Sequence, residues 1–389
     1  MSKIFDLINE LCPEGVKFDE LGVICKSLAK GTLKQEDLVD KGAYPVVNSS
    51  RDYYGFYDKY NNEANAFTIA SRGEYAGFVK FIDCKFWAGG LCYPYTSKDE
   101  DYVLTKFIFY FLKSIEKKNM DILVARGSIP ALNKSDFDKV KIPLPPMEVQ
   151  REIVRILDSF TLLTEELTEE LTARKKQYEF YRDFLLSFDE LDKNGGGCEL
   201  KMLGDIGEVR MCKRILKEQT SVNGEVPFYK IGTFGKEADA YISKELFDEY
   251  RSKYSYPKIG EVLISASGTI GRAVIFNGND AYFQDSNIVW IENDEGQVLN
   301  RYLFYFYQIA DWNIAEGGTI KRLYNDNLKK IKIPVPSLQT QQKVVDILDK
   351  FDTLVNSITE GLPREIELRR KQYEHYRELL LNFKPKMTA

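Results

Sequence analysis

The sequence predicts an α+β fold in which two mixed α/β domains are separated by an antiparallel coiled coil of two long helices, with an internal pseudo-twofold repeat. Three observations support this prediction: an internal duplication, long heptad patterns of apolar residues, and short apolar segments punctuated by glycine in the regions between them. Each copy of the duplication is a globular stretch followed by a long helix.

The duplication is clearest in two blocks of sequence. Residues 142–160 (IPLPPMEVQREIVRILDSF) return as residues 333–351 (IPVPSLQTQQKVVDILDKF) with 9 of 19 positions identical, at an offset of 333 − 142 = 191 residues. Residues 174–188 return as residues 369–383 with 10 of 15 positions identical, at an offset of 369 − 174 = 195. Unrelated segments match at about one position in fifteen, so the chain repeats itself. The globular stretches diverge far more than the helices, which predicts one common frame carrying two unlike domains.

The first globular domain is predicted over residues 1–145 and the second over 203–336, with a glycine-rich linker at 193–202. Both domains show the same order of elements: an extended segment, a glycine-punctuated apolar hairpin, an aromatic helix, a tight turn, and a strand that ends at Ile-Pro-x-Pro. In order, the paired segments are 44–47 with 226–229, 66–81 with 261–276, 103–112 with 299–309, 127–129 with 318–320, and 142–145 with 333–336.

Long helices follow each domain, over residues 146–192 and 337–383, and a short tail occupies 384–389. Apolar residues recur in steps of three and four, which is typical of a coiled-coil seam. The second copy carries four extra residues, and Gly361 and Pro363 interrupt its seam, so we expect a kink or a restart there. Each helix needs a partner, and its own repeat can pack against it antiparallel. The alternative is a helical hairpin that serves only as core.

Composition places few restrictions on the class of protein. The chain has 389 residues, of which 44% are hydrophobic and 29% charged, as in soluble proteins of two or three domains. Residues 1–15 lack the features of a signal peptide, and no stretch approaches the length of a membrane span, so we expect a cytoplasmic protein. The six cysteines form no CxxC pair and there is one histidine, His375, so we expect neither a zinc site nor a disulfide framework.

Charge is unevenly distributed along the chain. Lys and Arg minus Asp and Glu gives 18 − 15 = +3 for residues 21–145 and 17 − 18 = −1 for residues 203–336. The helical segment 146–192 gives 6 − 12 = −6 and the segment 337–383 gives 7 − 8 = −1. The acid is therefore concentrated in the first helix. The nearly neutral domains are compatible with local basic faces on DNA.

Catalytic motifs are absent from the sequence. There is no Gly-x-x-x-x-Gly-Lys-Ser/Thr loop and no Gly-x-Ser-x-Gly elbow, and the glycine-rich segment 267–271 lies inside a predicted hairpin. His375 is predicted on the surface or seam of a helix, where the first copy has Phe180, so a histidine general base is not expected. These observations predict a chain that does no catalysis itself.

The repeated helical regions resemble those of type I restriction-modification specificity subunits. The resemblance rests on the Ile-Pro-x-Pro strand ends, the glutamines that follow (Gln150 and Gln341-Gln342), the Asp-x-Phe pairs at 158–160 and 349–351, and the run RKKQYEFYR at 174–182. It covers the whole chain. The tandem Thr-Glu-Glu-Leu at 164–167 and 168–171 is similar to short repeats whose number sets the domain separation in some family members.

The resemblance implies a function without catalysis. The two domains would be target-recognition domains that read an asymmetric bipartite DNA target, with an unread spacer set by the coiled coil. Two modification subunits would bring S-adenosylmethionine and methylate adenine, and restriction subunits would bring ATP and magnesium for cleavage. The acidic helix around residues 165–170 is a candidate docking face for these partners, or alternatively a solvated flank.

Candidate base-reading residues are polar or aromatic and lie on loops beside the hairpins, where Arg, Lys, Asn and Gln can contact base edges. In the first domain they are Asn48, Ser49, Arg51, Tyr53, Tyr54, Arg72, Tyr75, Arg126 and Ser128. In the second domain they are Lys213, Arg214, Lys230, Thr233, Lys236, Ser267, Thr269, Arg272, Lys321 and Arg322. Each has the alternative reading of a solvated charge or a turn former. Arg72, Arg272 and Arg322 rank highest because they adjoin glycine-bearing turns that could approach a groove of DNA.

Two rival functions are weighed against this one. The first is a coiled-coil adaptor whose two domains bind protein or peptide and never touch DNA. The second is a fused DNA methyltransferase, which the absence of an Asn-Pro-Pro-Tyr-like motif disfavours. Co-purification with large methyltransferase subunits would separate the specificity subunit from the adaptor.

Overall fold

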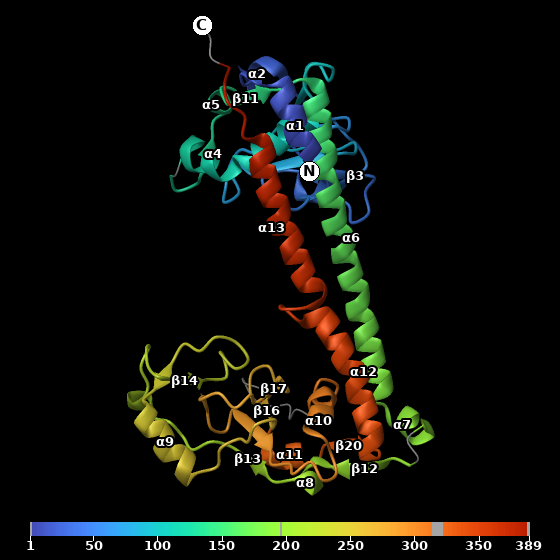
Figure 1. The fold of residues 1–389 in the computed structure, drawn as a ribbon, viewed down its shortest axis with the longest axis vertical. Coiled ribbons are helices and arrows are strands. Elements are labelled where there is room, and N and C mark those ends of the chain that lie inside the picture. Colours follow the sequence, from blue (N-terminus) through green and yellow to red (C-terminus); the bar gives the residue numbers. More distant parts are fainter. Residues whose placement is uncertain (1, 126, 195–196, 313–321, 387–389) are drawn as a thin grey trace. The chain divides into compact units, whose positions relative to one another are not determined.

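The computed structural model describes residues 2–125, 127–194, 197–312 and 322–386 (Figure 1). The chain forms two compact units. Unit 1 comprises Met1–Thr168 with Glu365–Ala389, and unit 2 comprises Glu169–Arg364. Each unit therefore contains one sheet-bearing domain together with helical segments from both repeats. The division falls inside long helices, so the predicted limits of the domains and of the linker stay predictions.

The sheets of unit 1 are built from short strands. A four-stranded antiparallel sheet has the order β2 (Cys25–Ser27), β8 (Cys92–Ser97), β5 (Ala66–Ala70), β6 (Val79–Ile82). A three-stranded sheet has the order β4 (Gly55–Tyr57), β3 (Tyr44–Val47), β7 (Trp87–Ala88), and its β3–β7 pair is parallel. Two strand pairs complete the unit: β1 (Lys17–Glu20) with β11 (Lys141–Leu144), and β9 (Val124–Ala125) with β10 (Ala131–Leu132).

Unit 1 also contains several helices and one 3-10 turn. They are α1 (Ser2–Leu11), α2 (Leu21–Ile24), α3 (Thr105–Ser114), α4 (Glu116–Leu123), α5 (Lys134–Phe137), the 3-10 turn η1 (Gln35–Asp37), the first part of α6 (Met147–Leu185) and most of α13 (Gly361–Leu381). All five residues of β5 are buried. The aromatic helix α3 buries Phe107 and Ile108 in a core that also contains Leu157 of α6 and Leu380 of α13. Removing these side chains from water is the main stabilising contribution.

Unit 2 repeats this topology. Its four-stranded sheet has the order β13 (Val209–Arg210), β19 (Ile288–Ile291), β16 (Val262–Ser265), β17 (Ala273–Ile275). Its three-stranded sheet has the order β15 (Tyr241–Ile242), β14 (Val226–Tyr229), β18 (Tyr282–Phe283), and β14–β18 is again the parallel pair. Strand β12 (Glu199–Met202) pairs with β20 (Lys332–Val335). Besides the remaining part of α6 and the start of α13, the helices are α7 (Phe188–Asn194), α8 (Leu203–Ile206), η2 (Lys217–Gln219), α9 (Lys244–Lys253), α10 (Asn300–Tyr307), α11 (Asn325–Lys329) and α12 (Leu338–Asn356).

The predicted fold class is confirmed in its parts. Both predicted hairpins are present, as β5–β6 and β16–β17, and both aromatic helices are present, as α3 and α10. The two predicted strands that end at Ile-Pro-x-Pro are also present, as β11 and β20. The turn predicted at residues 318–320 lies outside the described residues. None of the described helices is both long enough and apolar enough to cross a membrane.

Equivalent glutamines attach each long helix to its own domain. Gln150 Nε2 donates to the carbonyls of Tyr102 and Pro145, and its Oε1 accepts from the backbone N–H of Leu104 at 3.0 Å. Gln341 makes the same three contacts in unit 2, to the carbonyls of Gln297 and Pro336 and the N–H of Leu299. Both glutamines are fully buried, and the repeated sequence thus produces a repeated hydrogen-bond network.

Equivalent aspartates make a second attachment. Asp158 accepts from Lys106 Nζ at 2.8 Å and from the hydroxyl of Tyr110 at 2.5 Å. Asp349 accepts from Arg301 Nε at 2.6 Å and from the hydroxyl of Tyr305. In both repeats, therefore, the aspartate of the Asp-x-Phe pair on the long helix bonds to the aromatic helix of the domain.

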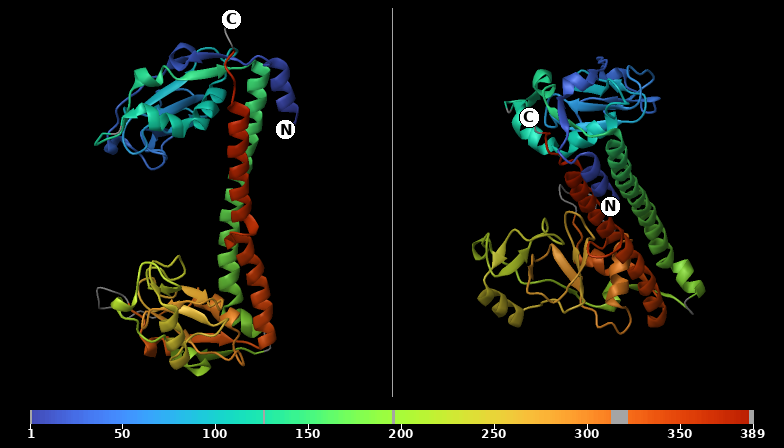
Figure 2. Two further views of the ribbon diagram at one scale, coloured as in Figure 1. Left: turned by 60° about the vertical axis from the view of Figure 1, so that its left-hand side comes forward. Right: turned by 45° about the horizontal axis from the view of Figure 1, so that its top comes forward.

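The long helices pack in pairs taken from opposite repeats (Figures 1 and 2). In unit 1, Phe160 of α6 stacks on Tyr376 of α13, with ring centroids 5.6 Å apart and an interplanar angle of 20°. In unit 2, Tyr181 of α6 stacks on Phe351 of α12, at 5.6 Å and 26°. Phe160 and Phe351 are equivalent positions of the duplication, and so are Tyr376 and Tyr181. The two contacts are therefore the same contact with the repeats exchanged, as a pseudo-twofold relation requires.

The predicted interruption of the second helix is confirmed. Helix α12 ends at Asn356 and α13 begins at Gly361. Ser357 is the C-cap residue of α12, and its Oγ accepts from the backbone N–H groups of Thr359 and Glu360 in the turn between the two helices. Gly361 has φ +76°, where a Cβ would lie 2.4 Å from the carbonyl oxygen of Thr353. Glycine is thus required for this restart.

Candidate nucleic-acid interface

Three loops of unit 1 come together around the β5–β6 turn. The guanidinium of Arg51, in the loop after β3, lies 5.1 Å from the ring centroid of Tyr75 in that turn. The backbone of Arg72 pairs with Ala131, and the N–H of Gly73 donates to the carbonyl of Pro130 at 2.9 Å. The structure therefore brings together the loops that carry residues 48–54, 71–78 and 127–130, which lie far apart in sequence.

Arg72 is the cation that the β5–β6 turn carries. Its side chain is exposed and makes no hydrogen bond or ion pair with another described residue. The next residue, Gly73, has φ +91° and open space where a Cβ would stand. Ser128 is exposed on the neighbouring loop. Both side chains are therefore available to a ligand that approaches this turn.

Aromatic rings extend the same surface. Tyr53 and Tyr54 are 39% and 46% exposed. Lys80 of β6 places its ammonium 3.7 Å from the centroid of the Tyr53 ring and donates to the carbonyl of Arg51 at 3.1 Å. Burial lowers the pKa of Lys80. Exposed tyrosines beside cations can stack on bases and contact phosphates at once.

Two of the predicted residues of unit 1 serve the fold at least in part. The side-chain Oδ1 of Asn48 accepts from the backbone N–H of Leu91 at 2.9 Å, which ties the loop after β3 to the start of β8. Ser49 is half-buried on the same loop. The predicted residue Arg126 lies outside the described residues.

Unit 2 carries a polar cleft of about 530 Å³ beside its parallel strand pair, β14–β18. Three predicted residues line it: Arg214, Lys230 and Arg322. The cleft also contains polar side chains that the sequence analysis missed, namely Lys217, Thr220, Gln284 and Asn287. The segment Gln284-Asp285-Ser286-Asn287 is an unbroken polar run between β18 and β19, a signal that would have indicated a functional loop.

The cations of this cleft bond to protein groups that a DNA ligand could replace. Arg214 pairs with Asp285 at 2.9 Å, but the Arg214 side chain is 67% exposed. Lys230 pairs with Asp239 at 2.8 Å, and Arg322 Nη2 donates to the carbonyl of Ser286 at 3.2 Å. Exposed ion pairs contribute little to stability, so a phosphate or a base edge can replace these partners at small cost. Gln284 and Asn287 add amides of the kind that read adenine.

Other predicted residues of unit 2 hold loops in place. Arg272 is half-buried and donates from Nη1 to the carbonyl of Phe234 at 2.8 Å, so it ranks below Arg322 as a groove contact. The Oγ1 of Thr233 accepts from the N–H of Lys230. Ser267 is buried and donates to Asn287 Oδ1 at 2.8 Å, while the carbonyl of Thr269 accepts from Ser265.

The other lysines predicted to contact DNA in unit 2 take no part in the hydrogen bonds described above. Lys213 places its ammonium 5.1 Å from the ring centroid of Tyr254. Lys236 is exposed and makes no ion pair with another described residue. Lys321 lies outside the described residues. No group of three or more His, Cys, Asp or Glu within the described part of the chain could hold a metal ion.

Comparison with known proteins shows the family. Residues 13–174 and 196–368 match the family described as "type I restriction modification DNA specificity domain". A Haemophilus influenzae protein named as a type I restriction enzyme specificity subunit is 51% identical over 369 residues, which cover 89% of this chain and 93% of the relative. A type I restriction enzyme specificity subunit of Escherichia coli is 33% identical over 405 residues, covering 96% of each chain.

Solved structures agree on the fold. The S subunit of a type I restriction-modification system from M. genitalium superposes with a TM-score of 0.62 at 19% sequence identity, covering 96% of this chain and 97% of that chain. A chain from a study of complex assembly in the type I R-M system superposes with a TM-score of 0.56 at 15% identity, covering 95% and 98%. The duplicated topology, the exchanged helix pairs and these matches together show that the chain belongs to the type I restriction-modification DNA specificity family.

Proposed function

We propose that this chain selects the DNA target of a type I restriction-modification complex. Each domain reads one part of an asymmetric bipartite sequence, and the helices set the length of an unread spacer. The observation that carries the proposal is that two domains of the same topology present unlike side chains at equivalent loops. Unlike donors and acceptors in the major groove select unlike bases.

The two surfaces differ in kind. Unit 1 offers aromatic rings interleaved with cations, at Tyr53, Tyr54, Arg51 and Arg72. Unit 2 offers a cleft with arginines and amides, among them Arg322 and the missed Gln284 and Asn287. Arginine pairs with guanine and amides pair with adenine in bidentate geometry.

The long helix supports the proposal of a fixed spacer. Helix α6 has 39 residues without a break. At 1.5 Å per residue it measures about 58 Å, which exceeds one turn of B-DNA of roughly 34 Å. A continuous helix of this length suits an element that holds two recognition domains at a constant separation.

The chain itself is proposed to do no chemistry. Two modification subunits would bind S-adenosylmethionine and methylate adenine, and restriction subunits would use ATP and magnesium to cleave. Two similar proteins support such partners: one is a subunit of a type I restriction enzyme, and the other comes from a study of complex assembly in a type I system. The acidic face formed by Glu165, Glu166, Glu169 and Glu170 is exposed on α6, as a docking face for a partner must be.

Mapping of N6-methyladenine across the host genome tests this proposal. Deletion of the gene for this chain should remove methylation from one bipartite motif, and re-expression should restore it. The deletion strain that carries an empty vector is the control for re-expression. Unchanged methylation after deletion would favour the adaptor, whose domains never touch DNA.

A further inference from the structure

A basic groove in unit 1 lies beside the loops already described. It has a volume of about 970 Å³ and lies between β6, α3, the first part of α6 and α13. Its cations include Lys80, Lys113, Arg370 and Arg377, and tyrosine rings at positions 53 and 373 form part of its wall. The groove therefore joins a strand and helix of the first domain to a helix of the second repeat.

Arg377 is incompletely satisfied in this groove. Its Nε is buried and has no hydrogen-bond partner among the described residues. Its guanidinium lies 5.3 Å from the ring centroid of Tyr373. A buried charged donor without an acceptor is costly, so a site of this kind is suited to an anionic ligand that supplies the missing acceptor.

The second repeat shows how the same position is satisfied internally. Tyr178 and Arg182 are the equivalents of Tyr373 and Arg377, at the offset of 195. The side chain of Gln308 accepts from the Tyr178 hydroxyl at 3.2 Å and from Arg182 Nη1 at 3.4 Å. Arg182 also pairs with Asp183 at 2.8 Å. Unit 2 therefore supplies this arginine with acceptors from its own chain.

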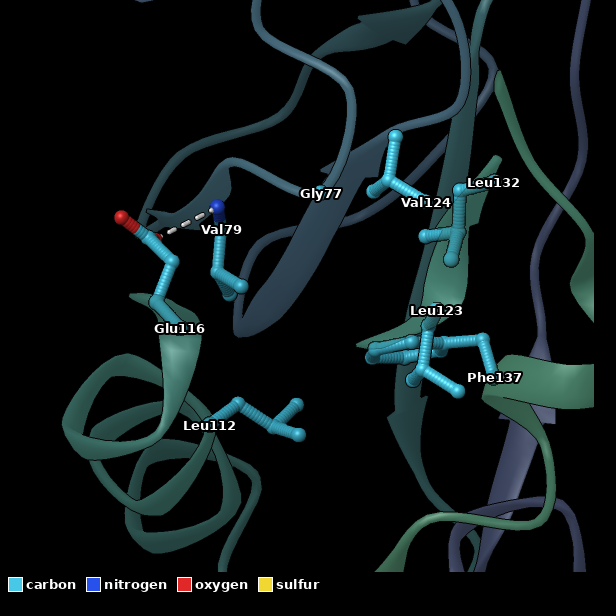
Figure 3. A pocket seen from close by; sticks show the side chains of 8 residues that line it. All are labelled: Gly77, Val79, Leu112, Glu116, Leu123, Val124, Leu132 and Phe137. Atoms are coloured by element: carbon cyan, nitrogen blue, oxygen red, sulfur yellow. Dashed lines mark hydrogen bonds between the residues drawn. The ribbon is translucent and has the colours of Figure 1, made fainter. Parts of the chain in front are cut away.

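In unit 1 the equivalent of Gln308 is Lys113, again at the offset of 195. An acceptor is thus replaced by a second cation. Lys113 donates to Glu116 Oε2 at 2.7 Å and to the carbonyl of Val79. Glu116 also accepts from the N–H of Val79, beside a small void of about 10 Å³ (Figure 3). Burial lowers the pKa of Lys113, and the nearby charges of Arg377 and Arg51 lower it further.

The carboxylates of the groove do not satisfy Arg377. Asp158 is bound by Lys106 and Tyr110, as described above. Asp83 and Glu165 line the groove but are exposed. Because Glu116 neutralises Lys113, the nearby charges of Arg51 and Arg377 leave an excess of positive charge next to this hollow.

We propose that this groove binds a phosphate of the DNA backbone and is a positioning site that unit 1 has and unit 2 lacks. The inference rests on the proposed function in DNA recognition. The groove is continuous with the candidate base-reading loop, because Lys80 contacts both the Tyr53 ring and the Arg51 carbonyl. Contacts to phosphate set the register of a protein on DNA without reading sequence.

Lys113→Gln tests the site, because it recreates the arrangement native to unit 2. Equilibrium binding of the complete methyltransferase complex to a duplex carrying its target would be measured from 50 to 200 mM salt. The logarithm of the binding constant decreases with the logarithm of the salt concentration, and the magnitude of this slope should decrease by about one. Each phosphate contact contributes roughly 0.9 to that magnitude. Arg377→Gln should give the same change, and Arg182→Gln in unit 2 is the matched control that should leave the slope unaltered.

Three outcomes would overturn the site. The first is an unchanged salt slope in Lys113→Gln with a normal melting temperature, and the second is an equal fall in Arg182→Gln. The third is loss of partner-subunit binding without DNA, which would identify an acidic protein segment as the ligand. Failure of the proposed function looks different, because the unmodified chain would then direct no methylation to any motif. Success requires unchanged half-sites and spacer on methylation mapping of Lys113→Gln.

Discussion

The accessibility of single side chains separates candidates that looked alike in sequence. Arg72 and Arg272 both adjoin glycine-bearing turns, but the guanidinium of Arg72 is free of described partners and that of Arg272 holds the carbonyl of Phe234. Arg72→Ala should therefore relax or abolish recognition of one half-site and leave the other intact. The expected loss is about 1–3 kcal/mol of discrimination at one base pair. Methylation mapping of the variant measures it, and equal loss at both half-sites would indicate a general phosphate contact or misfolding.

A buried glutamine makes a stability prediction at the same scale. Gln341→Ala leaves the N–H of Leu299 and the carbonyls of Gln297 and Pro336 without their side-chain partner. The free energy of unfolding should fall by about 3 kcal/mol, because buried groups lose hydrogen bonds. Urea denaturation measures this. The neighbouring Gln342 is exposed and bonds only to Asp346 among described side chains, so Gln342→Ala is the control and should change stability by less than about 0.5 kcal/mol.

The sequence indicated where the polar loops lie, but it did not indicate which groups each side chain contacts. The run of residues 48–54 and the turn at Arg72 were found because polar and aromatic residues beside glycine have a local signature. Lys80, Lys113 and Arg377 were missed because each sits in a regular strand or helix, where a lysine or arginine reads as solvent-facing. Only the tertiary contacts between β6, α3 and α13 bring them together.

At the scale of elements, the restart of the second helix depends on one glycine. Gly361→Ala places an alanine at a left-handed backbone conformation and brings its Cβ against the Thr353 carbonyl oxygen. The free energy of unfolding should therefore fall by about 1–3 kcal/mol. Thermal unfolding followed by circular dichroism measures this. Gly232→Ala is a matched control in the same unit, because nothing lies within 4 Å of its added Cβ. Equal melting temperatures for both variants would contradict the requirement for glycine.

Local elements were predictable and non-local pairings were not. The hairpins β5–β6 and β16–β17, the aromatic helices and the long helices each have a periodicity that a short window reveals. The parallel pairs β3–β7 and β14–β18 join segments about 40 to 55 residues apart, and no local pattern records such pairing. Helix α9 was also missed, because unit 1 has no equivalent to reveal it by repetition.

At the scale of the whole molecule, duplication explains both the likeness and the difference of the two domains. The same glutamine, aspartate and aromatic contacts recur in each unit, so the frame is under the same physical constraints twice. The loops carry no such constraint and have diverged. Lys113 of unit 1 and Gln308 of unit 2 occupy equivalent positions but differ in chemistry, so the divergence also extends to the aromatic helices.

The central claim is that the helices determine the spacer and the loops determine the bases. Residues 164–171 form two Thr-Glu-Glu-Leu units within α6, and the hydroxyls of Thr164 and Thr168 bond to carbonyls one turn earlier. A third unit inserted after Leu171 would lengthen the helix by about 6 Å, comparable with one to two base-pair steps of roughly 3.4 Å. The most direct measurement is methylation mapping of this insertion variant. We predict a longer spacer between two unchanged half-sites, and altered half-site bases with an unaltered spacer would contradict the account.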